Sequence, residues 1–534
     1  MAVVMNIFKT DEIKSADNAY TNGDFERLTA LITRAGESVC EYIPEGASEI
    51  LIVSGTGNNG ADGLAAAYYL KKIGYNPTVW ILGRKPELNK TMTFFADKLA
   101  KENIGVNIIT PVSDNGLILH ILDDIKKSDV VIDAIFGTGF GGDLLPLFEI
   151  VINYINDYKK FTISVDIPSG VNGDTGSVLS TAIYADITVT FCNYKPGNIL
   201  MPGKEYCGKV YVADIGMPSK LFETAAEKRI SEKKFYQCFA DNKADRTSVK
   251  QLIFNRNPYG HKGDFGKVLI IAGAEGMTGA AQLCAKAALR SGAGLVYIAC
   301  PRKLLTIYET TVPEAVKIPL GTEESSFFTD EFTDELIKFS KNADVVLIGP
   351  GLGRKDETET FVRNFVKRSE KCSLIIDADA LYAYRNDIET LKNDLESTDF
   401  VITPHDGEFS NLTGEPAPFK DRLTLARQLA YYLNGNVLLK GSSTIIANCT
   451  NGFTVNLTGN SGIATAGSGD VLAGIIAGIA ASNNVSIYEA AYCGAYIHGL
   501  SGDIAADKLT EICVNATDII ENLANAYKRV IKDV

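Results

Sequence analysis

A run of branched apolar residues leads directly into a glycine-rich turn in EILIVSGTGNNGADG at residues 49–63. The run predicts a strand, and the residues after the turn predict a helix. Gly55, Gly57 and Gly60 fit the pattern G-x-G-x-x-G, in which glycines permit a tight turn and let a pyrophosphate approach the helix N-terminus. A turn that binds nothing would need the same glycines, so the loop is a candidate site only.

More strands of this kind follow at a spacing of roughly 25–30 residues, which leaves room for a crossover helix between neighbours. They are expected at residues 77–82, 106–110, 129–137, 161–170, 185–191 and 209–216. Short strands alternating with helices predict a parallel sheet with helices on both faces. We therefore expect a Rossmann-like, doubly wound α/β domain of three layers in residues 1–230.

The same pattern starts again after a charged, polar stretch at residues 219–258, in which no strand is evident. Residues 231–534 are therefore expected to form a second three-layer α/β domain. Its predicted strands are 267–273, 295–300, 344–351, 373–379, 399–405 and 436–441, followed by a hairpin-like pair at 444–449 and 453–457. The alternative is one large domain with a surface helix at the polar stretch.

Composition excludes several classes of protein. The 534 residues carry a net charge of −13, so a broad nucleic-acid surface is not expected. Ten scattered cysteines without a CxxC motif indicate reduced thiols. No signal peptide or run of membrane-spanning length is evident, and a cytoplasmic protein without membrane contact is expected. The motifs HExxH, GxxxxGK[ST] and GxSxG are absent, which argues against zincins, Walker-type NTPases and α/β-hydrolases.

Three loops of the first half follow predicted strands and should meet at one edge of the sheet. They are the glycine-rich turn above, DAIFGTGFGGD at 133–143 and VDIPSG at 165–170. Asn59, Asp133 and Ser169 would bring hard oxygen donors from the three loops, which suit an alkali or alkaline-earth cation. Ordinary turn capping by these residues is the alternative.

The first half resembles the NAD(P)H-hydrate epimerase family over about residues 10–217. The resemblance rests on GTGNNGADG, DAIFGTG, DIPSGVNGDTG and NYKPGN, with Ala61 where the family usually has glycine. It implies that Asn59, Asp133 and Ser169 hold K⁺, and that Asp166 binds the damaged ring and is the acid–base candidate, with Lys195 as a second candidate. The residues implied in binding the hydrated dinucleotide are Asn58, Asn59, Gly60, Ala61, Asp62, Gly137, Thr138, Gly139, Phe140, Gly141, Gly142, Asp143 and Asp166.

The most informative stretch of the second half is NSGIATAGSGDVLAG at residues 460–474. Its glycines precede an apolar helix whose first amides would form an anion site for a phosphoryl group. Asp470, at the start of that helix, could accept a proton from a substrate hydroxyl. A plain N-cap aspartate is the alternative.

This half resembles the NAD(P)H-hydrate dehydratase branch of the ribokinase-like fold over about residues 240–525. The resemblance rests on HKGDFG, RSGAGLV, GPGLG, DADAL, TPHDGE and ATAGSGDVLAG. It implies Asp470 as catalytic base and Mg²⁺ with ADP or ATP as cosubstrate. The residues implied in contacting the hydrate are Ala280, Gly353, His405 and Asp470, and those implied for the nucleotide are Lys440, Gly441, Ser442, Ser443, Thr444 and Gly469.

Together the two resemblances predict a bifunctional enzyme of nicotinamide repair. One half would interconvert the R and S hydrates of NADH and NADPH, and the other would dehydrate the S form with ADP or ATP. A small-molecule kinase and a nucleotide-responsive binding protein are the alternatives. A homo-oligomer is expected from the resemblance alone, and the preferences for ADP or ATP and for either hydrate stay open.

Overall fold

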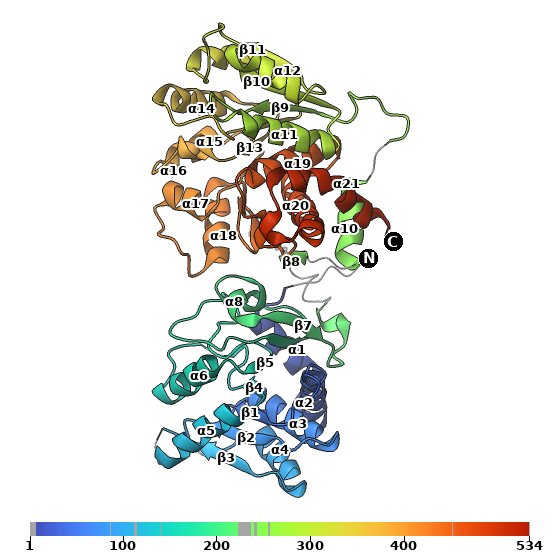
Figure 1. Ribbon diagram of the computed structural model, residues 1–534, viewed down its shortest axis with the longest axis vertical. Coiled ribbons are helices and arrows are strands. Elements are labelled where there is room, and N and C mark those ends of the chain that lie inside the picture. The colour runs from blue at the N-terminus through green and yellow to red at the C-terminus, as the bar shows by residue number, and fades with distance from the viewer. Residues whose placement is uncertain are drawn as a thin grey trace. The chain divides into compact units, whose positions relative to one another are not determined.

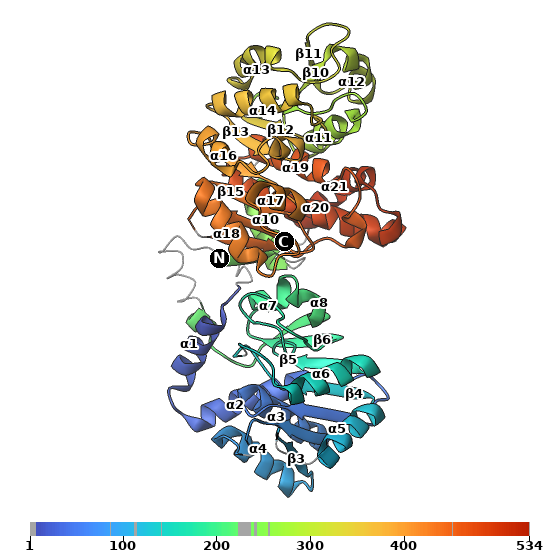
Figure 2. The same ribbon diagram turned by 90° about the vertical axis from the view of Figure 1, so that its left-hand side faces the viewer.

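A computed structural model describes most of the chain, and its described residues form two compact units (Figures 1 and 2). The first unit takes nearly all of its described residues from 7–222, and most of the second lies between 236 and 532. The expected boundary near residue 230 falls in 223–235, outside the described residues. Described are 7–85, 87–111, 115–139, 141–222, 236–239, 243–254, 257–450 and 452–532.

The first unit is built on a parallel sheet in the order β3-β2-β1-β4-β5-β6-β7. From β1 the chain adds strands in one direction and then crosses to β4 and adds them in the other, which is the doubly wound arrangement expected from the sequence. Its strands are β1 (Ile50–Ser54), β2 (Thr78–Leu82), β3 (Val106–Ile109), β4 (Val130–Ala134), β5 (Phe161–Val165), β6 (Ile187–Phe191) and β7 (Lys209–Ala213).

Strand β1 shows why the sheet carries a helical layer on each face. All five of its residues are buried. Ile50 and Ile52 pack in the core beneath α2, α3 and α4, whereas Leu51 and Val53 pack in the core beneath α5 and α6 (Figure 1). Continuous apolar runs of this kind are typical of strands covered on both sides. The helices of the unit are α1 (Thr10–Thr21), α2 (Phe25–Cys40), α3 (Asn58–Lys72), α4 (Lys90–Lys101), α5 (Asn115–Lys127), α6 (Pro146–Tyr158), α7 (Pro196–Ile199) and α8 (Gly203–Cys207).

The second unit contains a sheet in the order β11-β10-β9-β12-β13-β14-β15-β16-β17-β8. Strands from β11 to β15 are parallel, and the predicted hairpin β16–β17 adds two antiparallel pairings. The strands are β8 (Tyr236–Phe239), β9 (Lys267–Ile271), β10 (Leu295–Pro301), β11 (Val316–Leu320), β12 (Val345–Ile348), β13 (Ser373–Ile376), β14 (Phe400–Ile402), β15 (Asn436–Leu439), β16 (Thr444–Asn448) and β17 (Phe453–Asn456).

Neither end strand of this sheet was predicted from the sequence. The expectation of no strand within residues 219–258 is wrong, because β8 lies there and pairs in parallel with β17. Strand β11, which pairs with β10, was not predicted either. Each end strand has a partner on one side only and is four or five residues long. Short end strands lack the long apolar run that marks a central strand.

Helices cover both faces of the second sheet (Figure 1). One face carries α11 (Thr278–Arg290), α19 (Ser468–Ser482), α20 (Ile487–Leu509) and α21 (Ala516–Lys532), whose apolar residues share one core with β9 and β12. The other face carries α14 (Asp356–Arg368), α15 (Asp379–Tyr382), α16 (Ile388–Asp394), α17 (Asp406–Thr413) and α18 (Arg422–Leu433). The remaining helices are α10 (Lys243–Ile253), α12 (Leu305–Thr311) and α13 (Thr333–Ser340).

The glycines of α19 serve close packing inside this core. A Cβ at Gly474 would lie 2.4 Å from Cys284 O, and one at Gly478 would lie 2.5 Å from Ala288 O. Their absence lets the backbones of α19 and α11 touch. This apolar helix is therefore an internal element, and among the described residues no helix is long and apolar enough to cross a membrane.

Candidate active sites

The first unit contains a cavity of about 840 Å³ at the carboxyl ends of its strands. The loops after β1, β2, β4, β5 and β6 line it, together with α1 and α2. The cavity lies where the strand order reverses between β1 and β4, which is where doubly wound sheets bind ligands. The convergence of the three predicted loops at one edge is thus visible in the structure.

The glycines of the 55–60 turn are required by the approach of two loops. A Cβ at Gly55 would lie 2.0 Å from Ile135 O, and a Cβ at Gly60 would lie 2.0 Å from Gly55 O. Gly57 is the N-cap of α3, so Asn58 and Asn59 occupy the first turn of that helix at the cavity wall. Glycine at these places brings the amides of a helix N-terminus to the cavity.

Asp133 and Ser169 are in direct contact, and both are buried and do not line the cavity. Ser169 Oγ donates to Asp133 Oδ1 at 2.5 Å, and Ser164 Oγ donates to Oδ2 at 2.8 Å. The amides of Ser169 and Ile135 donate to the same carboxylate. Burial raises the pKa of Asp133, and the hydrogen bonds from Ser169 and Ser164 oppose that effect. These bonds hold the loops after β4 and β5 together.

Asn59 is half-buried, and the polar atoms of its side chain are buried without a partner among the described residues. Its Oδ1 and Nδ2 atoms make no hydrogen bond within the described part of the chain. A Cβ at Gly137 would lie 3.1 Å from Asn59 Oδ1, and the neighbouring Phe136 amide donates to Ser169 Oγ at 2.9 Å. Asn59 and Ser169 therefore border the same short segment, and an unsatisfied buried amide oxygen there suits a hard cation.

A buried ion pair forms the wall of the cavity beyond β5 and β6. Lys195 Nζ lies 2.5 Å from Asp166 Oδ1 and also donates to Thr190 Oγ1 at 2.8 Å and Phe191 O at 3.0 Å. Asp166 has a φ of 67°, a conformation that non-glycine residues seldom adopt. Strained residues of this kind cluster at functional sites. The structure thus brings together the two acid–base candidates that the resemblance implied.

Two further carboxyl groups approach this pair. Asp62 on α3 is buried, and desolvation, Asp166 and Asp17 raise its pKa well above the usual range although Lys195 acts against them. Asp17 on α1 lines the same cavity, and burial raises its pKa to about 6 against the opposing charge of Lys195. Asp17 was not predicted from the sequence, because it belongs to none of the motifs on which the resemblance rests.

Most of the implied epimerase residues border the cavity. Gly60 and Ala61 are buried behind the turn instead. Gly142 lies outside the cavity wall with a φ of 108°, and Phe140 is outside the described residues. The implied residues that line the cavity are Asn58, Asn59, Asp62, Gly137, Thr138, Gly139, Gly141, Asp143 and Asp166.

The second unit gathers charged groups at the N-terminus of α19. The N-cap is Gly467 with a φ of 86°, so Asp470 stands inside the first turn and is not the capping residue. A Cβ at Gly469 would lie 3.5 Å from Lys440 Nζ, which places that ammonium group beside the first amides of the helix. Amides and a cation at one point form an anion site.

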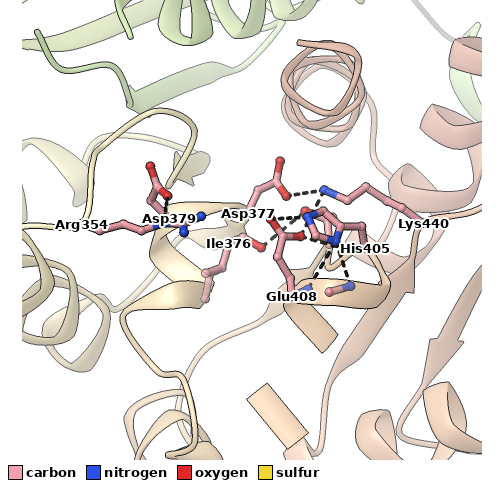
Figure 3. Close-up of polar contacts among 9 residues, drawn as sticks. Arg354, Ile376, Asp377, Asp379, His405, Glu408 and Lys440 are labelled. Atoms are coloured by element: carbon pink, nitrogen blue, oxygen red, sulfur yellow. Dashed lines mark hydrogen bonds and ion pairs between the residues drawn. The ribbon is translucent and has the colours of Figure 1, made fainter. Parts of the chain in front are cut away.

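Lys440 follows β15 and reaches two carboxylates that follow neighbouring strands (Figure 3). Its Nζ lies 2.8 Å from Asp377 Oδ1 and 3.6 Å from Glu408 Oε2. Burial favours a lower pKa for Lys440, but the charges of Asp377 and Glu408 outweigh it, and the pKa is raised. The lysine is therefore a permanent cation in this site.

Asp470 titrates near neutrality in this surrounding. Burial raises its pKa to about 7, the charge of Asp377 adds to the increase, and Lys440 opposes it. Asp379 and Glu408 raise it further. A carboxyl group with a pKa close to the working pH is suited to general base catalysis.

His405 has a local structural task. Its Nδ1 accepts hydrogen bonds from the amides of Gly407 and Glu408, so the ring caps α17 (Figure 3). The side chain is 59% exposed, and its Nε2 lies 3.5 Å from Glu408 Oε1. The capping role explains why a histidine is present even if it binds no ligand. The exposed edge of the ring could still contact a ligand.

The other implied residues surround the same strand ends. A Cβ at Gly351 would lie 2.9 Å from Ala280 Cβ, so the loop after β12 packs on the first turn of α11. The Gly353 amide donates to Asp379 Oδ2, and Arg354 Nε to Oδ1 (Figure 3). Past Lys440, the Thr444 hydroxyl donates to Gly441 O. Ser443 is buried and Ser442 is exposed.

Asp377, Asp379 and Glu408 were not predicted as site residues. Their signal was present, because DADAL and TPHDGE directly follow two strands that are neighbours in the sheet. A carboxylate at such a position points to the ligand-binding edge of a parallel sheet. The pairing with Lys440 required the third strand, β15, to be placed beside β14.

Comparison with known proteins agrees with two sites in two units. Residues 28–197 match the family described as YjeF-related protein N-terminus, and residues 268–525 match NAD(P)H-hydrate dehydratase. The bifunctional NAD(P)H-hydrate repair enzyme Nnr of Thermofilum pendens is 34% identical over 99% of this chain and 97% of its own length. The enzyme of the same name from Moorella thermoacetica is 36% identical over 91% of this chain and 88% of its own length.

A solved structure is also similar to the second unit. The ADP/ATP-dependent NAD(P)H-hydrate dehydratase from Bacillus subtilis, co-crystallized with ATP/Mg²⁺, is 26% identical with a TM-score of 0.45, covering 53% of this chain and 97% of that one. The similarity to the repair enzymes extends over nearly the whole chain and includes both units. This chain therefore belongs to the family of bifunctional NAD(P)H-hydrate repair enzymes.

Proposed function

We propose that the first unit interconverts the R and S hydrates of NADH and NADPH, and that the second unit dehydrates the S hydrate with ADP or ATP. The observation that carries the proposal is Asp470, a carboxyl group with a pKa of about 7 in the first turn of α19, beside Lys440. The separate cavity around Asp166 and Lys195 supports a second activity in the same chain.

The dehydration uses groups that the second site already holds. Asp470 removes the proton of the hydrate hydroxyl, and the oxygen attacks the terminal phosphoryl group of the nucleotide. The bond from that phosphorus to its bridging oxygen breaks, and AMP leaves from ADP, or ADP from ATP. The amides of α19 and the Lys440 ammonium offset the charge on the phosphoryl oxygens. The ring nitrogen then expels phosphate from the neighbouring carbon, and loss of a proton from the next carbon restores the dihydronicotinamide double bond.

Mg²⁺ fits the donor chemistry of this site. Asp377 and Glu408 supply hard carboxylate oxygens, and Mg²⁺ is usually held by one or two carboxylates together with substrate phosphates. The ion would supply charge neutralisation. We assign the hydrate to a surface around Ala280, Gly353, His405 and Asp470. The adenine nucleotide is assigned to residues 440–444 and Gly469.

Epimerisation is assigned to the cavity of the first unit. Hydration of the dihydronicotinamide places the hydroxyl on the carbon next to the ring nitrogen, so reversible opening of that carbon–nitrogen bond inverts the centre. Asp166, held by Lys195, accepts the hydroxyl proton. The loops at 58–62 and 137–143 bind the dinucleotide.

K⁺ is proposed at the junction of the loops after β1, β4 and β5. Asn59, Asp133 and Ser169 offer amide, carboxylate and hydroxyl oxygens, and the unpartnered Asn59 side chain supports the assignment. The ion would supply positive charge near the bound pyrophosphate. Crystals grown in K⁺ should show anomalous scattering consistent with K⁺ beside Asn59. A transition metal there, or no ion, would remove the assignment.

We also place the division of the two activities at residues 1–230 and 231–534. A cytoplasmic, homo-oligomeric enzyme is proposed. Nine described cysteines carry free thiols, which supports a reducing compartment. Sedimentation of the full chain tests the oligomer, and limited proteolysis tests the division.

The direct test mixes the purified chain with the R and S hydrates of NADH and with ADP. Absorbance of the dihydronicotinamide should rise until both epimers are consumed, because exchange feeds the dehydration. Nucleotide consumption without this absorbance would support a small-molecule kinase. Binding without turnover would support a nucleotide-responsive binding protein.

A further inference from the structure

The cavity of the first unit contains a further group suited to proton transfer, in addition to Asp166 and Lys195. Opening the carbon–nitrogen bond requires a base for the hydroxyl proton and an acid for the ring nitrogen. Asp166 fills the first role. The second role requires another residue at the cavity.

Lys195 is poorly placed to supply that proton. An ammonium group has three donors, and those of Lys195 are directed to Asp166 Oδ1, Thr190 Oγ1 and Phe191 O. The side chain is only 1% exposed. Lys195 therefore orients Asp166, and the acid has to come from another element.

We propose, on the basis of the epimerase function above, that Asp17 of α1 is a second catalytic residue, which donates the proton to the ring nitrogen while Asp166 removes the hydroxyl proton. The carbon–nitrogen bond breaks as the carbonyl forms, and the aldehyde arm rotates. Closure on the other face returns the ring-nitrogen proton to Asp17 and the hydroxyl proton to the oxygen. Atoms and electrons balance without a further reactant.

The geometry of the cavity supports Asp17. Its element, α1, is fixed at its N-terminus because the Thr10 amide and hydroxyl both donate to Asp174 at 2.8 Å. The Asp17 carboxyl makes no hydrogen bond or ion pair within the described residues, so it is available to a substrate. Asp17 is partly exposed and can exchange its proton with water, whereas Asp62 is buried.

The electrostatic surroundings support the same assignment. Burial raises the pKa of Asp17 to about 6, Lys195 opposes this, and Asp166 adds to it. The pKa of Asp62 is raised well above its usual range, so that group keeps its proton. Two carboxyl groups with opposite tasks are characteristic of acid–base pairs. The titratable or charged residues that share the cavity wall with Asp17 are Lys14, Asp62, Arg84, Lys85, Glu87, Asp143, Asp166, Cys192 and Lys195.

The test measures R-to-S exchange by chiral chromatography between pH 5 and pH 9. Because the acid form of Asp17 is active, exchange in the unsubstituted enzyme should fall as pH rises above about 6. Asp17→Asn should lower kcat/KM about 100-fold at pH 6 and abolish that decrease, while calorimetry shows unchanged affinity for the hydrate. Asp17→Glu should restore part of the rate. Asp11→Asn, an exposed change on the same helix, should keep both the rate and the profile.

The outcomes separate this proposal from the function on which it rests. Failure of the unsubstituted enzyme to exchange the hydrates would overturn the epimerase function itself. Normal exchange with an unchanged rate and pH profile in Asp17→Asn would overturn the role of Asp17 alone. So would a loss confined to affinity, or a decrease above pH 6 that disappears in Asp62→Asn and persists in Asp17→Asn.

Discussion

Replacing Asp470 by Asn gives the sharpest test of the second site. The amide keeps the shape of the side chain but accepts no proton at neutral pH. Loss of a general base typically costs about 10²–10⁴-fold in rate, or about 2.7–5.4 kcal/mol in activation free energy. We expect dehydration of pure S hydrate to fall within that range, while R-to-S exchange in the other unit continues at its original rate.

The pH profile adds a second readout. The ionised form of Asp470 is the active base, and its pKa is about 7. The kcat/KM of the original enzyme should therefore rise about tenfold between pH 6 and pH 8 and level off above. In Asp470→Asn this increase should be absent. The assay follows dihydronicotinamide absorbance with ADP at saturation, and Asp507→Asn, an exposed aspartate of α20, is the matched control.

Stability provides a check that does not depend on activity. The pKa of Asp470 is raised in the folded state, so the unfolded chain releases the proton more easily. The folded state therefore loses stability as pH rises from the ordinary carboxyl range through about 7. Asp470→Asn should raise Tm more at pH 8 than at pH 5. A variant that keeps most of the dehydratase rate, or keeps the increase between pH 6 and pH 8, would refute the assignment.

Three further changes test neighbouring parts of the argument. Lys440→Ala should raise the nucleotide KM. It should also move the midpoint of the dehydratase pH profile to higher pH, because a cation that stabilises the ionised base is lost. If the KM and the midpoint are both unchanged, Lys440 does not belong to the site. Asp166→Asn should slow exchange about 10²–10⁴-fold and leave dehydration of pure S hydrate nearly intact, and loss of both activities in folded protein would instead indicate one composite site. Gly349→Ala should unfold at lower temperature than Gly414→Ala: both glycines have positive φ, but only at Gly349 would the added Cβ lie 1.7 Å from Asp377 O, whereas nothing lies within 4 Å at Gly414. Equal decreases in Tm for the two variants would show that the positive φ, and not the contact with Asp377 O, causes the loss of stability at Gly349.

The sequence was enough for the fold because the relevant signals are local. Strands β1 and β4 are buried on both faces, and such strands need unbroken apolar runs, which a single sequence displays. A Cβ at Gly55 or Gly60 would lie 2.0 Å from a backbone oxygen, so glycine is required at both positions and the turn between strand and helix can be recognised from the sequence. Strand β8 was missed because it is an end strand of only four residues, too short to show the apolar pattern of a central strand.

The site divides in the same way. The positions of Asp470 at the start of α19 and of Asp166 at the cavity could be predicted, because each lies in a motif at the start of a helix or the end of a strand. The charged groups around them could not be predicted. The Lys440–Asp377 pair joins residues that are 63 positions apart, and Asp17 lies at its cavity on a helix that contains none of the motifs.

By itself the sequence determined which residues turn, which are buried and which motifs carry chemistry, because backbone geometry and apolar patterning act between near neighbours. The tertiary structure alone decided that Lys195 donates to Asp166, Thr190 and Phe191, that the side-chain amide of Asn59 has no partner among the described residues, and that the pKa of Asp470 is raised to about 7. These properties depend on distance and desolvation, and both arise only when strands far apart in the chain are brought to one edge of a sheet.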